Sequence, residues 1–84
     1  MSPEDILSQV REIIGDVLDQ PDVQVNLDST AADVDGWDSF AHINIVVAVE
    51  ARFGIKINTA EIEEIHNVGE LVELVHRKLK ARGA

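Results

Sequence analysis

Three segments of this chain carry apolar residues at the spacing of an α-helix, and this pattern limits the possible fold more than any other feature. In residues 3–18 the apolar positions recur every three or four residues: Ile6, Leu7, Val10, Ile13, Ile14, Val17 and Leu18. Similar stripes occupy residues 39–53 and 68–79. Because amphipathic helices must bury their apolar faces against one another, the sequence predicts an all-α fold.

The residues at the ends of these segments indicate where the main helices start and stop. Pro21 is expected to end the first helix no later than Gln20, since proline restricts the residue before it. Asp38 is expected to cap the second helix and to place Ser39 at its first helical position. Gly54 supplies the stop, because glycine readily adopts the left-handed conformation that ends many helices.

The rest of the chain predicts one short helix and one long loop. Thr59 is expected to cap the short helix, with Ile62 and Ile65 facing the core. Asn67 is expected to cap the last helix, and Glu70 follows three positions later in an asparagine version of the capping box. Residues 21–37 lose the helical period and predict an extended loop.

We therefore expect a single small domain that covers residues 1–84. Its predicted architecture is a four-helix, mainly antiparallel bundle of three main helices and one short helix, with a long first loop. Only three aromatic residues occur, so isoleucine, valine and leucine must build the core.

The composition excludes several classes of function. Acidic residues outnumber basic ones 16 to 7, so phosphate backbones repel the chain and nucleic acid is not an expected partner. The absence of cysteine excludes disulfides, thiolate metal sites and a cysteine nucleophile. The N-terminal residues are acidic where a signal peptide is basic, and the longest apolar run, Ile45–Val49, is far shorter than the roughly 20 residues of a membrane span. We expect a cytoplasmic protein without a membrane span.

Two further kinds of site are disfavoured by their spacing. The aspartates before Gly36 resemble the middle of a calcium-binding EF-hand loop, but its first and last ligand positions hold Ala31 and His42. A hydrolase built on Ser39 lacks the Gly-x-Ser-x-Gly turn and a sheet to present it. The sequence therefore predicts neither a metal site nor a catalytic residue.

The most informative segment is Asp-Gly-Trp-Asp-Ser-Phe, residues 35–40, which joins the long loop to the second helix. A serine in the first turn of a helix lies beside free backbone N–H groups and the positive end of the helix dipole. That position favours a phosphate or a phosphodiester. The simpler alternative is that Asp38 and Ser39 only cap and solvate the helix end.

This segment resembles the Gly-x-Asp-Ser-Leu attachment motif of acyl and peptidyl carrier proteins, with Phe40 where the family usually has leucine. The resemblance extends from Ile6 to Leu79 and includes Phe-Gly-Ile at residues 53–55. It implies that Ser39 carries a 4′-phosphopantetheine arm in phosphodiester linkage. The terminal thiol of that arm would hold an acyl or aminoacyl group as a thioester.

The resemblance also implies a set of partners. The chain would be a carrier and not an enzyme, modified by a phosphopantetheinyl transferase and then served by enzymes that load and transfer acyl or aminoacyl groups. A monomer is expected. Asp38 would help to present Ser39, and the candidate partner-binding residues are Trp37, Phe40, Ile43, Asn44 and Glu50.

The charge of the second helix favours a specialised member of this family. From residue 39 to residue 53 the chain has one carboxylate, Glu50, and one guanidinium, Arg52, so its formal charge is zero. The corresponding helix of fatty-acid carriers is strongly acidic. The segment is more similar to stand-alone carriers of specialised lipid or secondary-metabolite pathways.

Each of these residues also has a structural interpretation. Phe40, Ile43 and Val47 are expected first of all to belong to the core, in one face shared with Val46 and Phe53. Trp37 is expected to anchor the loop by packing, and His42 to be a surface histidine. The alternative function is that of an unmodified helical protein-interaction module with a carrier-like fold.

Overall fold

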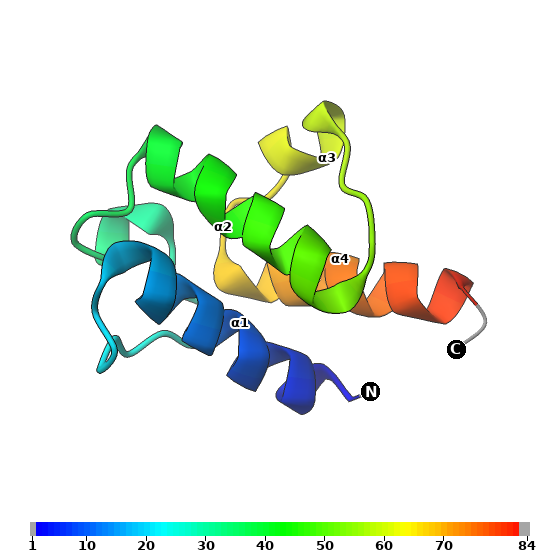
Figure 1. The fold of residues 1–84 in the computed structure, drawn as a ribbon, viewed down its shortest axis with the longest axis horizontal. Helices are drawn as coiled ribbons and strands as arrows, with labels where there is room; N and C mark the ends of the chain where they lie inside the picture. Colours follow the sequence, from blue (N-terminus) through cyan, green and yellow to red (C-terminus); the bar gives the residue numbers. More distant parts are fainter. Residues whose placement is uncertain (1, 83–84) are drawn as a thin grey trace.

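The computed structural model describes residues 2–82, and within that range the chain forms four α-helices and one 3₁₀ turn without any strand. The elements are α1 (Pro3–Leu18), η1 (Ala31–Asp33), α2 (Ser39–Phe53), α3 (Thr59–Glu63) and α4 (Val68–Ala81). Figure 1 shows that α1 runs opposite to α2 and α4, and it packs against both. The all-α, four-helix prediction is confirmed.

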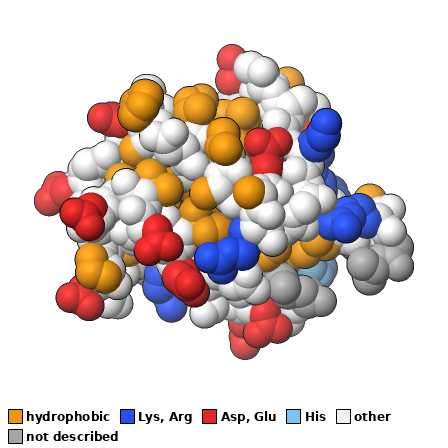
Figure 2. All heavy atoms as spheres, in the orientation of Figure 1, with side chains coloured by type: hydrophobic (Ala, Val, Ile, Leu, Met, Phe, Trp, Pro, Cys, Tyr) orange, Lys and Arg blue, Asp and Glu red, His pale blue; other side chains and the backbone are white. Residues whose placement is uncertain are grey.

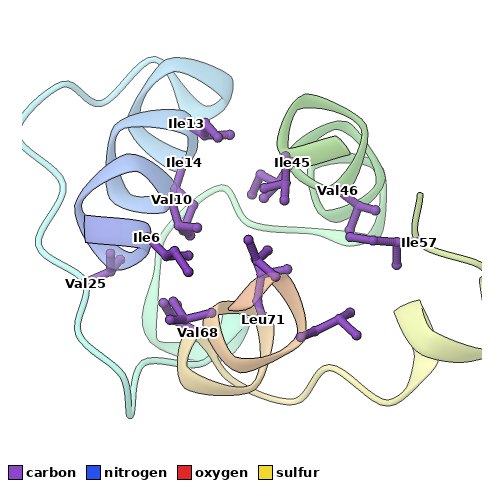
Figure 3. Close-up of a cluster of buried hydrophobic side chains, with 14 of the residues drawn as sticks. Ile6, Val10, Ile13, Ile14, Val25, Ile45, Val46, Ile57, Val68 and Leu71 are labelled. Atoms are coloured by element: carbon purple, nitrogen blue, oxygen red, sulfur yellow. The ribbon is translucent and has the colours of Figure 1, made fainter. Parts of the chain in front are cut away.

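The core lies where α1, α2 and α4 meet. Figure 3 shows side chains of all three helices pointing toward one another, including Ile6 and Ile14 of α1, Ile45 of α2 and Leu71 of α4. These four side chains are fully buried, and burial of each contributes about 1.5–3 kcal/mol. Among the described residues no polar side chain is buried, so aliphatic packing holds the helices together.

The segment between α1 and α2 is a loop that is bound to the helices at several places. The Arg11 guanidinium donates two hydrogen bonds to the Val25 carbonyl, at 3.1 and 3.2 Å, and the Val25 side chain is buried. Farther along, the Leu27 carbonyl accepts a hydrogen bond from Gly69 N at 2.8 Å. The predicted loop is thus present and largely irregular, with the short turn η1 inside it.

The expected ends of α2 are confirmed. Asp38 caps the helix, since its side chain accepts a hydrogen bond from Ala41 N, and Gly54 ends it with a φ angle of 66°. Arg82 also donates a 2.9 Å hydrogen bond to the Phe53 carbonyl, so a residue just past α4 satisfies the end of α2. The two helices are therefore joined where both of them end.

The predicted cap of the short helix is wrong by one residue. Asn58, not Thr59, is the N-cap of α3. Asn58 and Glu61 form a reciprocal capping box: the Asn58 side chain accepts from Glu61 N at 2.9 Å, and the Glu61 carboxylate accepts from Asn58 N at 3.0 Å. Two adjacent residues have good capping side chains, and the glutamate three positions after Asn58 decides between them.

The predicted cap of α4 is correct, but its capping box is only half formed. The Asn67 side chain accepts a hydrogen bond from Glu70 N at 2.8 Å. The Glu70 carboxylate accepts from His66 N at 2.9 Å. The return bond of the box therefore reaches the residue before the cap.

Part of the core predicted for α2 is wrong. Phe40, Ile43 and Val47 are 76%, 49% and 56% exposed, and together with the exposed Asn44 they form what we call the α2 outer face. At about 100° per residue these positions lie opposite the buried side of the helix. That side carries Ala41, Ile45, Val46, Val49 and Phe53. Figure 2 shows hydrophobic side chains gathered at the surface over α2.

Candidate functional site

The chain enters α2 through a tight turn at Gly36. Its φ angle of 84° lies in the left-handed region, which glycine adopts without steric cost. The Gln20 side-chain amide donates a 2.7 Å hydrogen bond to the Asp35 carbonyl. The turn is therefore fixed to the C-terminal end of α1 and delivers Asp38 and Ser39 to the surface.

Ser39 is the first residue of α2 and its side chain is unengaged. Asp38 holds the start of the helix, since its Oδ1 accepts from Ala41 N at 2.8 Å and its carbonyl accepts from His42 N at 2.9 Å. Ser39 itself is exposed, and its hydroxyl makes no hydrogen bond with any residue in the range 2–82. The hydroxyl is thus held in place by the helix and remains accessible.

The electrostatics of this helix end differ from those of the other helices. Apart from the Asp38 cap, the first turn of α2 carries no acidic residue, whereas the first turns of α1, α3 and α4 each carry at least one. At α2 the one carboxylate of the helix end is therefore that of the cap itself, Asp38, and the first turn adds none. An anion attached here is stabilised by the dipole and by the backbone N–H groups.

A shallow groove of about 530 Å³ begins at Ser39 and runs beside α2. Its lining residues come from η1, the turn, α2 and the connection between α3 and α4: Ala31, Trp37, Asp38, Ser39, His42, Ile43 and Ile65. A smaller, partly open space of about 20 Å³ adjoins the groove and shares Ala31, Trp37, His42 and Ile65 with it. One water molecule requires roughly this volume. A slender group can thus lie along the groove, whereas the smaller space does not admit a long chain.

Trp37 and His42 form a pair at the wall of this groove. Trp37 is 8% exposed, and its Nε1 donates a 3.2 Å hydrogen bond to Nδ1 of His42. The two rings are stacked with their centroids 6.0 Å apart. The packing role predicted for Trp37 is confirmed, but the prediction of a plain surface histidine is wrong, because His42 is half-buried against the indole.

The remaining candidate partner-binding residues divide into two groups. Phe40, Ile43 and Asn44 lie exposed on the α2 outer face. Glu50 is half-buried, and its carboxylate accepts a 2.8 Å hydrogen bond from Ile57 N, so it fixes the connection after α2. Val47 also belongs to the outer face and was not among the predicted contact residues, although its spacing of seven from Phe40 places both on one side of a helix.

The short helix α3 precedes the groove residue Ile65 and is attached to α4 through Glu61. Its carboxylate accepts from Asn58 N and lies 2.9 Å from the Lys78 ammonium. Both interactions favour the charged form and lower the pKa of Glu61, the backbone hydrogen bond most strongly. The helix that leads to Ile65 is therefore held on α4 by a charge-assisted contact.

These features coincide with those of a known family. Residues 8–75 match the sequence profile described as a phosphopantetheine attachment site. The chain belongs to this family. Its carrier relatives are similar over almost their whole length: the acyl carrier protein of Thermotoga maritima is 35% identical over 78 residues, which cover 93% of this chain and 96% of the relative.

Two further comparisons agree. The acyl carrier protein of Petrotoga mobilis is 33% identical over 94% of this chain and 93% of its own. The solution NMR structure of the holo acyl carrier protein from Geobacter metallireducens has a TM-score of 0.83 and 33% identity, over 90% of this chain and 87% of that one. Family membership makes this chain a phosphopantetheine-bearing acyl carrier and not an enzyme.

The residues at the start of α2 fit the covalent 4′-phosphopantetheine of this family. An accessible hydroxyl without an intramolecular partner, a helix N-terminus and an adjoining groove are present together.

None of the helices described between residues 2 and 82 has the length and the apolar character that a membrane-spanning helix requires.

Proposed function

We propose that Ser39 is the residue that carries the arm, and that the chain shuttles acyl or aminoacyl thioesters between enzymes of a specialised lipid or secondary-metabolite pathway. The observation that carries this proposal is the exposed, unpartnered Ser39 hydroxyl at the first position of α2. It lies inside the range of residues 8–75 that matches the attachment-site family.

The chain's own residues present this hydroxyl and receive the phosphate. Asp38 keeps the first turn of α2 formed through its bond to Ala41 N, which holds Ser39 on the surface. The free N–H groups of that turn and the helix dipole stabilise the phosphodiester once it has formed. The arm, when attached, supplies the thiol that a chain without cysteine lacks.

The α2 outer face is the surface that we propose for docking of the enzymes that modify and load the carrier. It begins one residue after Ser39, and its three large side chains, Phe40, Ile43 and Val47, are exposed. Because α2 has a formal charge of zero, the surface fits an apolar enzyme surface better than a basic one. This neutral, apolar character is the support for a specialised pathway.

Two of the candidate partner-binding residues from the sequence analysis are not part of this proposed surface. Trp37 is buried in its contact with His42, and Glu50 is bonded to Ile57 N. Substitution of either would disturb the fold beside the site. The proposed contact residues are therefore Phe40, Ile43, Asn44 and Val47.

The attachment site is tested by intact mass after incubation with coenzyme A, magnesium and a broad-specificity phosphopantetheinyl transferase. We expect the wild-type chain to gain one phosphopantetheine and Ser39→Ala to gain none. Ser8→Ala, which removes an exposed serine on α1, is the matched control and gains one arm. A gain in Ser39→Ala contradicts the assignment. No gain in the wild type, beside a carrier that is modified in parallel, favours an unmodified interaction module.

The docking surface is tested with the same transferase. Phe40→Ala combined with Val47→Ala is expected to raise the KM for the apo-carrier several-fold, while the free energy of unfolding changes by less than about 0.5 kcal/mol per substitution. The change in KM should persist at high salt, because apolar contacts are not screened. Lys56→Ala, at an exposed position after α2, is the control; an equal effect there contradicts the proposed surface.

A further inference from the structure

The hydrogen bond between Trp37 and His42 fixes the protonation pattern of the histidine. An indole nitrogen is only a donor, so Nδ1 of His42 must be the acceptor in the 3.2 Å contact. In a neutral imidazole the other nitrogen then carries the proton. The His42 ring therefore presents an N–H group at Nε2.

This N–H group belongs to a residue beside the attachment site. His42 follows Ser39 by three residues, which places both side chains on the same side of α2. Both line the groove that begins at Ser39. Nε2 of His42 has no hydrogen-bond partner within residues 2–82, so this donor is unused in the protein alone.

We propose that His42 binds the phosphodiester of the 4′-phosphopantetheine arm through Nε2–H and thereby directs the arm along the groove. The proposal rests on the attachment at Ser39. Phosphate oxygens are strong acceptors, and among the residues that line the groove Asp38 is the one carboxylate, whose charge repels a phosphate. A fixed N–H donor one turn away offsets that repulsion, and Trp37 holds the ring in place by stacking.

The first test compares the three histidines before and after the arm is attached. Side-chain ¹⁵N and ¹H NMR spectra are recorded on the apo-protein and on the holo-protein, after intact mass has established one arm at Ser39. The absence of a mass gain in Ser39→Ala identifies Ser39 as the attachment site in this sample. We expect the His42 ring signals to shift on attachment. The signals of His66, which pairs with Glu70, and of His76 on α4 are expected to stay unchanged. Unchanged His42 signals overturn the proposal.

The second test follows the phosphorus atom directly. The ³¹P signal of the holo-protein is expected to move in His42→Ala and to stay at the wild-type position in His76→Ala. In Trp37→Phe, which keeps an aromatic ring but removes the indole N–H, the ¹⁵N spectrum is expected to show a mixture of the two neutral forms of His42. An identical ³¹P signal in wild type and His42→Ala overturns the proposal.

These outcomes separate the two proposals. Absence of the mass gain contradicts the attachment at Ser39, whereas a normal mass gain without any change at His42 contradicts only the role of this histidine. If His42→Ala does not fold, the comparison of wild-type apo- and holo-protein decides the question without it.

Discussion

The N-termini of α2 and α4 begin in the same way and serve different purposes. In each helix a polar side chain accepts a 2.8 Å hydrogen bond from the third helical residue: Asp38 from Ala41, and Asn67 from Glu70. The first residue of α4, Val68, is fully buried, whereas the first residue of α2 is an exposed serine. The local cap alone therefore does not make a site.

The N-termini of α2 and α4 differ in whether the preceding loop covers them. At α4 the Leu27 carbonyl accepts from Gly69 N, and it lies so close that a Cβ at Gly69 would be 2.8 Å from it. The loop thus occupies the N–H group of this turn, and Glu70 adds a negative charge. At α2 the loop turns away at Gly36. A helix end therefore becomes a site when the fold leaves it uncovered.

The largest expected effect comes from the first residues of the two helices. Val68→Ala should lower the free energy of unfolding by about 2 kcal/mol, because a fully buried side chain loses its contacts. Ser39→Ala, at the same position of α2, should change it by less than about 0.5 kcal/mol. Urea denaturation followed by circular dichroism measures both. Equal losses would show that the α2 end is as much a part of the core as the α4 end.

The two caps give an intermediate effect. Asp38→Ala and Asn67→Ala should each lower the free energy of unfolding by about 1 kcal/mol, since each leaves one backbone N–H without its partner. Only Asp38→Ala should also slow arm attachment, because the turn that holds Ser39 frays. The rate of mass gain, measured where both variants are fully folded, checks this. Asp38→Asn keeps the acceptor and is the control; equal slowing by Asn67→Ala would remove the distinction between the two ends.

The smallest expected effect concerns the acidic first turn of α3. The pKa of Glu61 is lowered from its ordinary 4.5, chiefly by the Asn58 N–H and next by Lys78. A carboxyl whose pKa is lower in the folded state stabilises the fold above its unfolded pKa, and this contribution is lost as the pH falls through the folded pKa. Glu61→Gln should therefore have a lower free energy of unfolding than wild type at neutral pH. The difference between the two should become smaller below about pH 4.5.

Denaturant unfolding at several pH values measures this difference in the free energy of unfolding. Glu63→Gln removes a carboxyl from the exposed side of the same helix and is the matched control for net charge. If the difference between wild type and Glu61→Gln stays constant down to acid pH, the charge of Glu61 does not contribute to the stability of the fold.

Local signals were enough to predict the helices and the position of Ser39. The stripe of α1, the aspartate before Ser39 and the glycine after Phe53 each act within a few residues, and each is found in the structure as expected. The error at α3 was also local. The pattern of Asn58 and Glu61 was present in the sequence and distinguishes the real cap from Thr59.

Other features depend on how distant segments pack. Apolar residues surround much of α2, so the periodicity did not decide which of them face α1 and α4. The structure buries Ile45 and leaves Phe40 outside. The contact of Trp37 with His42 joins residues only five apart, but it depends on how the turn before α2 is folded, and no spacing in the sequence indicates it.

The placement of Trp37 gives this protein a spectroscopic label of its own. The chain has one tryptophan and no tyrosine, so its intrinsic fluorescence arises from a single indole. That indole is nearly buried, lies two residues before Ser39 and lines the same groove. Arm attachment, loading of the thiol and docking of an enzyme can therefore each be followed through tryptophan emission, without a dye and without altering the surface that partners contact.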